Sequence, residues 1–184
     1  MIKSESVKRK KNLQNRRNKK RKSEATEQQY QVVQIKRVSK VVKGGKKLSF
    51  RTVIIIGLGK GTVGIGIGKA NDISNSIKKA VMDGKKNLIT IPITKNESIP
   101  HTVHGKFGAS NVIIRPSTLG SGVIAGSSIR TVLEIAGIKN VLAKQLGSGN
   151  LLNNARATLN GLKQLKTINQ TANDRNLNVE ALYF

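Results

Sequence analysis

The pattern of hydrophobic and polar residues changes sharply near residue 30 of the 184-residue chain. Residues 1–29 show no hydrophobic periodicity, and eleven of the first 22 residues are Lys or Arg. Like charges repel, and a segment without apolar surface cannot offset the backbone entropy of about 1–2 kcal/mol per residue that ordering costs. The pattern therefore predicts a disordered basic extension at 1–29, which becomes ordered only on a partner.

From residue 30 onward, the pattern alternates with the two-residue period of β-strands. Strands are predicted at 31–38, 48–58 and 63–68, and Gly44 and Gly45 permit a tight turn between the first two. In the third strand every second residue is Gly, which leaves one face of the strand without side chains. A helix can therefore pack closely against that face.

The helix predicted next begins after Asn71 or Asp72, either of which can cap it. Its expected apolar face comprises Ile73, Ile77, Ala80, Val81 and Leu88. Four lysines point away from that face, namely Lys78, Lys79, Lys85 and Lys86. Together these elements predict a β-β-β-α unit over residues 30–87 with a basic outer surface.

A second unit is predicted over residues 88–182. Its candidate strands are 88–93, with Pro92 in an edge position, 101–107, 111–115 and a short stretch around Val141. The Gly-rich stretch 120–126 leads into a helix that Gly137 ends, and the buried face of this helix is Ile129, Val132, Leu133 and Ala136. A longer helix at 150–166 buries Leu151, Leu152, Ala155, Leu159 and Leu162. The fold class is therefore α+β with two domains.

The net charge of +25, from 34 Lys and Arg against 9 Asp and Glu, narrows the classes of partner. A folded domain with so much like charge repels itself unless a polyanion neutralises it. Nucleic acid is the favoured polyanion, because each neutralised phosphate releases condensed counterions. A membrane-surface protein and a simple solubility effect remain as alternatives.

Aromatic residues make up only 3% of the chain, and there is no Trp. Modules that bind single-stranded bases stack them on aromatic rings or planar Arg side chains. The composition therefore predicts recognition through phosphates, 2′-hydroxyls and helical shape rather than through stacked bases.

The sequence argues against several kinds of chemistry. There is no Cys, which excludes disulfides and thiolate metal sites, and no apolar run approaches the roughly 20 residues that span a bilayer. His101 and His104 lack a third metal ligand nearby. Residues 59–64 match G-x-G-x-x-G, but a strand follows them, which favours a hairpin turn over a cofactor loop. With no convincing catalytic carboxylate pair either, we expect no enzyme activity, cofactor, metal or small-molecule substrate.

The basic hairpin at 40–47 is the strongest candidate site in the sequence. Its glycines expose backbone N–H groups at a tip flanked by ammonium groups, which suits contact with phosphates. A solvated charged loop is the alternative. In a chain that already carries +25, contact with RNA is favoured.

With these features in order, the chain resembles the universal family of small-subunit ribosomal protein five, of bacterial or plastid type. The matching stretches are 37–45, 57–70, 120–126, 129–138 and 140–144. The resemblance runs in matching order from about residue 32 to residue 182. It implies an N-terminal domain like a double-stranded-RNA-binding domain and a C-terminal β-α-β domain of a type shared with several ATPases and translation factors. It also implies assembly on 16S-type rRNA beside ribosomal proteins four and eight.

The resemblance further implies roles for individual residues. The family's rRNA-contacting hairpin loop is matched by Lys43, Gly44, Gly45 and Lys46. Gly122 and Arg130 match positions at the interface with protein four, where the family influences decoding accuracy. Arg130 should point outward from its helix and be free to pair across that interface. Arg37 and its basic neighbours would lie toward the channel through which mRNA enters the small subunit.

Taken with the charge pattern, the expected RNA-binding residues are Arg37, Lys40, Lys43, Gly44, Gly45, Lys46, Lys47, Lys69, Lys78, Lys79, Lys85 and Lys86. The chain departs from the family at Leu58, where an acid is common, and at Ile65 and Ile67, where aromatic residues are usual. These departures leave the local packing open. Two rival functions also stay open, a free nucleic-acid-binding protein such as an RNA chaperone and a nucleotide-using enzyme.

The composition also bears on location. Lys, Ile and Asn are abundant, as in proteins from AT-rich genomes, and the start of the chain fits a transit peptide poorly. We therefore expect a protein of the plastid (chloroplast) stroma, with the bacterial cytoplasm as the alternative.

Overall fold

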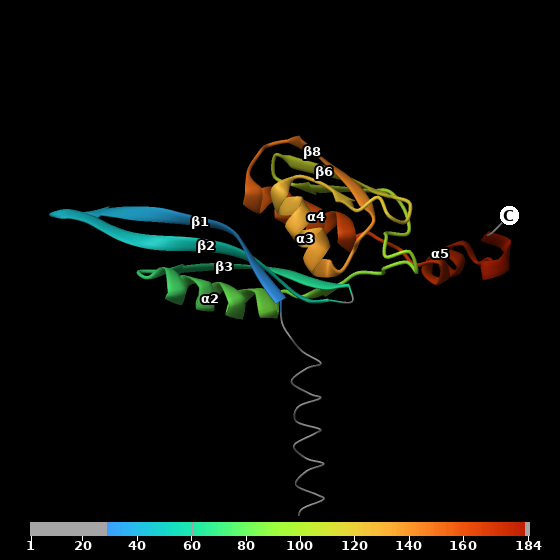
Figure 1. Cartoon of the computed structure of the whole chain (residues 1–184), viewed down its shortest axis with the longest axis horizontal. Coiled ribbons are helices and arrows are strands. Elements are labelled where there is room, and N and C mark those ends of the chain that lie inside the picture. Colours follow the sequence, from blue (N-terminus) through green and yellow to red (C-terminus); the bar gives the residue numbers. More distant parts are fainter. Residues whose placement is uncertain (1–28, 60, 183–184) are drawn as a thin grey trace, which may run out of the picture.

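The computed structural model describes residues 29–59 and 61–182, so the predicted extension lies outside the described residues apart from Gln29. The described chain forms two four-stranded sheets with helices packed against them. In Figure 1 the first sheet and its helix form the lower layers, and the second unit lies above them. The predicted α+β fold is confirmed.

The first unit is an antiparallel sheet in the order β1-β2-β3-β4 with one helix on it. Its elements are β1 (Gln29–Val42), β2 (Gly45–Gly59), β3 (Thr62–Ala70), α2 (Ile73–Lys86) and β4 (Ile89–Thr90). Strands β1 to β3 and α2 form the β-β-β-α arrangement that the hydrophobic pattern predicts.

Strand β2 is buried on both faces over residues 52–57, where its apolar residues do not alternate with polar ones. Ile54 and Ile56 pack with Ala80 of α2 in one cluster. Val53 and Ile55 point to the other face and join the larger core that the second unit provides. A continuous apolar run of this kind is typical of a strand covered on both sides.

The glycines of β3 bring α2 into backbone contact with the sheet, as the sequence predicts. A Cβ placed on Gly66 would overlap the carbonyl oxygen of Ala80, and one on Gly64 would lie 2.8 Å from the carbonyl oxygen of Gly84. On the same face of the sheet, the hydroxyl oxygens of Thr52 and Ser76 are 2.6 Å apart and share a buried hydrogen bond. The first sheet therefore accepts only a helix whose contact face is small.

The predicted contact face of this helix is only partly confirmed. Ala80 is buried as predicted, and Val81 packs against the same cluster. The other buried residues of the helix are Ser76 and Gly84, whereas Ile73 is 42% exposed. Leu88 lies beyond the helix, which ends at Lys86. The spacing of apolar residues predicted that the larger side chains of the helix face the sheet, but the backbone of β3 lies too close to α2 to leave room for them.

The second unit has a sheet in the order β5-β6-β8-β7. Its elements are β5 (Val103–Phe107), β6 (Ser110–Pro116), β7 (Val123–Ile124), α3 (Ser127–Ala136), β8 (Val141–Gly147) and α4 (Leu151–Lys163). Strands β7 and β8 are parallel and α3 connects them, which confirms the β-α-β arrangement. As predicted, Gly137 ends α3, with a φ of 86° that suits glycine at a helix C-terminus.

Helix α4 is shorter than the predicted 150–166, because it ends at Lys163. Ala155, Leu159 and Leu162 are buried as expected. Leu151 and Leu152 are only half-buried, since they lie in the first turn of the helix. The predicted buried face is therefore confirmed along the body of α4 and only in part at its start, where Leu152 packs against the core.

The short strand β4 belongs to the first sheet, although the sequence analysis assigned 88–93 to the second unit. Ile89 and Thr90 pair with Val63 and Thr62 of β3. The strand stops before Pro92, which has no N–H to donate to a ladder. The boundary between the units at residues 87 and 88 stays a prediction.

The two units share the larger of the two hydrophobic clusters. Val53, Ile55 and Val63 of the first sheet lie in the same cluster as Ile129 and Val132 of α3. The predicted buried face of α3 is thus confirmed, and Ile65, one of the residues whose packing the sequence leaves open, is buried in this cluster too.

Beyond α4, the chain forms two short elements that the sequence analysis missed, α5 (Ile168–Arg175) and a 3₁₀ turn, η1 (Val179–Leu182). Thr167 and Gln170 form a reciprocal capping box at the start of α5, a signal that is readable in the sequence. Among the described residues, no helix is both long and apolar enough to cross a bilayer.

We predict that Gly66→Ala destabilises the fold by about 1–3 kcal/mol, the usual cost of overpacking. The added methyl group would overlap the carbonyl oxygen of Ala80 in α2. Gly149→Ala is the control, because its Cβ would have no neighbour closer than 3.8 Å. Chemical denaturation measures both variants, and equal unfolding midpoints would contradict the close contact between β3 and α2.

Candidate nucleic-acid interface

The β1–β2 hairpin extends beyond the body of the molecule (Figure 1, left). Val42 pairs with Gly45, so Lys43 and Gly44 form a two-residue turn, and Gly44 has a φ of 91° that favours glycine. Val41 is 73% exposed, which indicates that the far part of the hairpin lacks a core. The four residues matched to the family's rRNA-contacting loop therefore lie together at an exposed tip.

The strand register sorts the remaining cations of the hairpin onto two faces. Lys40 lies directly opposite Lys47. Arg37 lies opposite Phe50 and is three residues from Lys40 along β1. Because successive side chains of a strand alternate between its faces, an odd separation places Arg37 on the other face of the ribbon. Lys46, opposite Val41, shares the face of Arg37. The structure thus separates Arg37 and Lys46 from Lys40 and Lys47.

Two further cations lie on the face of Lys40 and Lys47, and the sequence analysis missed both. Lys36 is opposite Arg51, and Arg51 is opposite Lys69 of β3. All three side chains are exposed. The two-residue turn sets the register of the hairpin, so counting back from the turn would have found Lys36 and Arg51.

Acidic residues are missing from this part of the chain. There is no Asp or Glu between Glu27 and Asp72, a stretch that includes all of β1, β2 and β3. The three ion pairs among the described residues are elsewhere, namely Arg130–Glu134, Lys139–Glu97 and Lys166–Asp174. The hairpin therefore has a positive potential that no carboxylate within it offsets.

The lysines of α2 are all exposed, but they divide between the two ends of the helix. Lys78 and Lys79 line a hollow of about 530 Å³ together with Ser49 and Lys69 of the sheet, and Asp72 is the one acid in its lining. Lys85 and Lys86 lie in the last turn, outside this hollow. Asp83 of α2 is engaged elsewhere, since its carboxylate accepts the backbone N–H of Ile67 at 3.0 Å.

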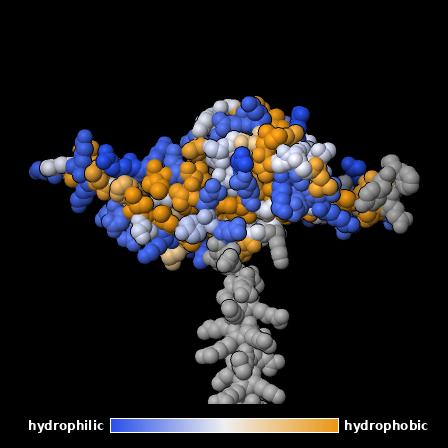
Figure 2. All heavy atoms as spheres, in the orientation of Figure 1, coloured by the Kyte–Doolittle hydropathy of each residue, from blue (hydrophilic) through white to orange (hydrophobic). Residues whose placement is uncertain are grey.

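The hydropathy of the surface agrees with this arrangement. In Figure 2 the far end of the hairpin is covered mainly by hydrophilic residues, and hydrophobic residues gather nearer the body. The hairpin and the hollow beside α2 therefore offer cations on a surface suited to a polyanion.

Gly122 and Arg130 lie on the second unit, near the start of α3. Gly122 has a φ of 71°, and a Cβ there would have no neighbour within 4 Å. The space beside Gly122 is therefore open within the chain. Arg130 is exposed as predicted, and its Nε–H donates to Glu134 at 2.7 Å. A guanidinium has further N–H donors, so pairing across an interface stays a prediction. Arg130 and Glu134 are one turn of α3 apart, which brings their charges together.

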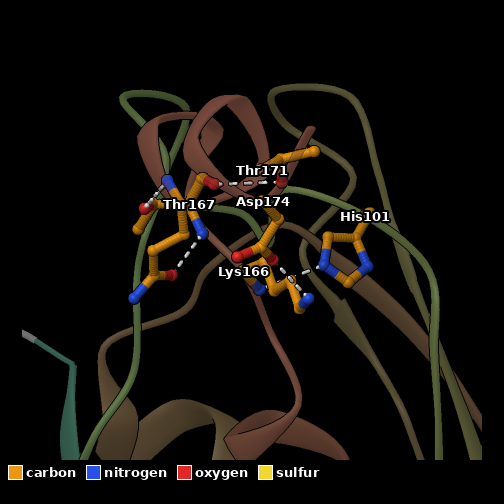
Figure 3. Close-up of polar contacts among 6 residues, drawn as sticks. His101, Lys166, Thr167, Thr171 and Asp174 are labelled. Atoms are coloured by element: carbon orange, nitrogen blue, oxygen red, sulfur yellow. Dashed lines mark hydrogen bonds and ion pairs between the residues drawn. The ribbon is translucent and has the colours of Figure 1, made fainter. Parts of the chain in front are cut away.

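The structure places the other motifs in structural roles. Gly59 and Gly61 have positive φ at the turn between β2 and β3, and a strand follows, as the hairpin interpretation requires. His101 accepts the backbone N–H of Lys166 through Nε2 at 3.1 Å (Figure 3). Its Nδ1 lies 3.1 Å from the carbonyl oxygen of Thr102. Within the described residues, no group of three or more metal-ligating side chains occurs.

Comparison with known families gives two matches in the order of the two units. Residues 29–92 match ribosomal protein S5, N-terminal domain, and residues 105–175 match ribosomal protein S5, C-terminal domain. The chain is 60% identical over 143 residues to small ribosomal subunit protein uS5c of Pyropia yezoensis, covering 78% of this chain and 82% of the relative. The chain belongs to the ribosomal protein S5 family. It is a structural, non-enzymatic protein.

Other S5 relatives indicate the lineage. The uS5c of Rhodomonas salina is 63% identical over 137 residues, covering 74% of this chain and 82% of that protein. The uS5 of Nostoc punctiforme, a bacterium, is 57% identical over 143 residues, covering 78% and 82%. These relatives support the plastid small ribosomal subunit as the location of this S5 protein, with a bacterial one as the alternative.

We predict that His101→Ala loosens α5 of this S5 protein, because the backbone N–H of Lys166 loses its acceptor. A hydrogen bond of this kind contributes about 0.5–1.5 kcal/mol. Hydrogen exchange at residues 166–172 should become faster, while β6 and β8 keep their protection. His104→Ala is the control, since His104 is an exposed residue of β5. Similar exchange in both variants would contradict an anchoring role for His101.

Proposed function

We propose that this S5 protein binds 16S-type rRNA through its basic hairpin and the lysines of α2. The observation that carries the proposal is the run of opposed cations on β1, β2 and β3, in a stretch without an acid. Phosphates are the natural partners of such a surface, because Lys and Arg side chains and backbone N–H groups position a protein on the nucleic-acid backbone.

The proposed binding depends on phosphates and shape rather than on base stacking. Phe50 is half-buried in the hairpin, and the ring of Phe107 is covered by the guanidinium of Arg156, 5.0 Å from its centroid. Tyr30 is 54% exposed, but it lies at the start of β1, away from the hairpin tip. An interface of this kind suits helical RNA, which proteins recognise mainly through phosphates and 2′-hydroxyls.

Protein contacts form the second part of the proposal. We infer that the open space at Gly122 and the exposed Arg130 face ribosomal protein four, and that protein eight is a further neighbour. The resemblance to the family supports both partners. Through the contact with protein four, the chain would support decoding accuracy in translation.

Arg37 has a separate place in the proposal. It lies on the opposite face of the hairpin from Lys40 and Lys47. This separation agrees with a position toward the mRNA channel, because one face of the ribbon can then contact rRNA while the other stays available to mRNA.

We predict that Lys43→Glu with Lys46→Glu weakens binding to 16S-type rRNA. Two phosphate contacts at the hairpin tip are lost, so the negative slope of log affinity against log salt should become less steep by about 2. The control is Lys95→Glu with Lys144→Glu, which makes the same change of charge at two exposed positions away from the hairpin. Unchanged binding and unchanged chemical protection of the rRNA in the hairpin variant would contradict an rRNA contact at the hairpin tip.

We predict that Gly122→Arg or Arg130→Leu raises misreading by ribosomes that carry the variant, while the fold stays intact. The long side chain at position 122 would enter the open space, at a local cost of about 1–2 kcal/mol for a non-glycine residue at positive φ. The leucine at position 130 would remove a surface charge. Glu134→Gln is the control, because it breaks the ion pair with Arg130 but keeps the guanidinium. Normal misreading in both test variants would contradict the contact with protein four.

Sedimentation distinguishes this proposal from a free RNA-binding protein. A constituent of the small subunit stays with the small particle when low Mg²⁺ separates the subunits in a sucrose gradient. A free RNA chaperone would instead spread through the gradient or remain near the top.

A further inference from the structure

The two faces of the β1–β2 hairpin differ in chemistry. We call one the cationic face, which consists of Lys36, Lys40, Lys47, Arg51 and Lys69. The opposite face holds Arg37 and Lys46 among exposed apolar residues, namely Ile35, Val41 and Leu48. The hairpin is thus amphipathic although its far part contacts no core.

In the protein without a bound partner, the cations of the cationic face repel one another across the strands. Lys40 and Lys47 are directly opposite each other, as are Lys36 and Arg51. Like charges directly opposite across an antiparallel pair are destabilising. No acid in the three strands relieves them. A polyanion bound to this face would remove the repulsion.

The spacing of the cations indicates a ligand with several phosphates. Lys40 and Lys47 form one row, and Lys36, Arg51 and Lys69 form a second row four residues along the strands. At about 3.3 Å per residue the rows are about 13 Å apart, and the three-strand row is about 10 Å wide. One phosphate cannot bridge these distances, but a stretch of RNA backbone can.

The cationic face also reaches the hollow at the end of β3. Helix α2 packs on the opposite face of the sheet, the face of Thr52. At the open edge of β3, however, Ser49 and Lys69 line the hollow together with Lys78 and Lys79 of α2, so three cations face the single carboxylate of Asp72 there. An RNA strand on the cationic face can therefore meet the lysines of α2 around this edge.

We propose that the cationic face is the side of the hairpin that contacts the rRNA backbone, with Lys36 and Arg51 as phosphate-binding residues. This inference rests on the proposed rRNA binding and assigns it to one face. Lys46 adjoins the turn and belongs to the tip. Further from the tip, the opposite face with Arg37 does not contact the rRNA backbone.

The test compares Arg51→Gln with Arg37→Gln in the full chain. Both variants remove one Arg from neighbouring positions of the same ribbon, on opposite faces. Binding to a 16S-type rRNA transcript is measured from low to high salt, and thermal unfolding is measured without RNA. Lys36→Gln is included as a second variant of the cationic face.

We expect Arg51→Gln and Lys36→Gln each to lower the salt slope by about one and the affinity about fivefold at about 0.15 M salt. Their unfolding midpoints should stay equal to the parent's or rise, because opposed charges are removed. Arg37→Gln should keep the parental slope. Equal losses from both faces would overturn the choice of face but keep rRNA binding by the hairpin. No loss in any variant would overturn the proposed rRNA contact of these strands as well.

Discussion

The close contact between β3 and α2 is the constraint on which the rest of the first unit depends. Alternate glycines in β3 let the helix backbone approach the sheet so closely that Ser76, Ala80 and Gly84 fill the contact. With α2 held at this distance, Ile54 and Ile56 are covered from one side. The other face of β2 is then available to α3, and the two units close over the larger cluster.

The same close approach recurs in the second unit. A Cβ on Gly105 of β5 would overlap the carbonyl oxygen of Ala157 in α4, and Gly161 lies on the other side of that contact. In both units a glycine-bearing strand receives a helix with small residues at the contact. Packing at this distance uses many weak dispersion contacts instead of a few large side chains.

Much of the fold follows from the sequence because the signals are local. The turn at Gly44, the alternating strands and the end of α3 at Gly137 each depend on neighbouring residues. Which residues of α2 are buried, and which sheet β4 joins, depend instead on contacts between segments that are distant in sequence. Among the site residues, composition identified the basic hairpin. The division of its cations between two faces required the pairing of β1 with β2.

The junction between the units has a mechanical consequence. The backbone N–H of Gly61 donates to the carbonyl oxygen of Ala136 at 2.9 Å, and Gly57 lies against Ile135. A hinge needs room at a junction, and here the end of α3 is bonded to the turn between β2 and β3. The hydrogen bond and the shared core therefore join the body of the first sheet and the second unit into one packed body, rather than two units linked by a flexible segment.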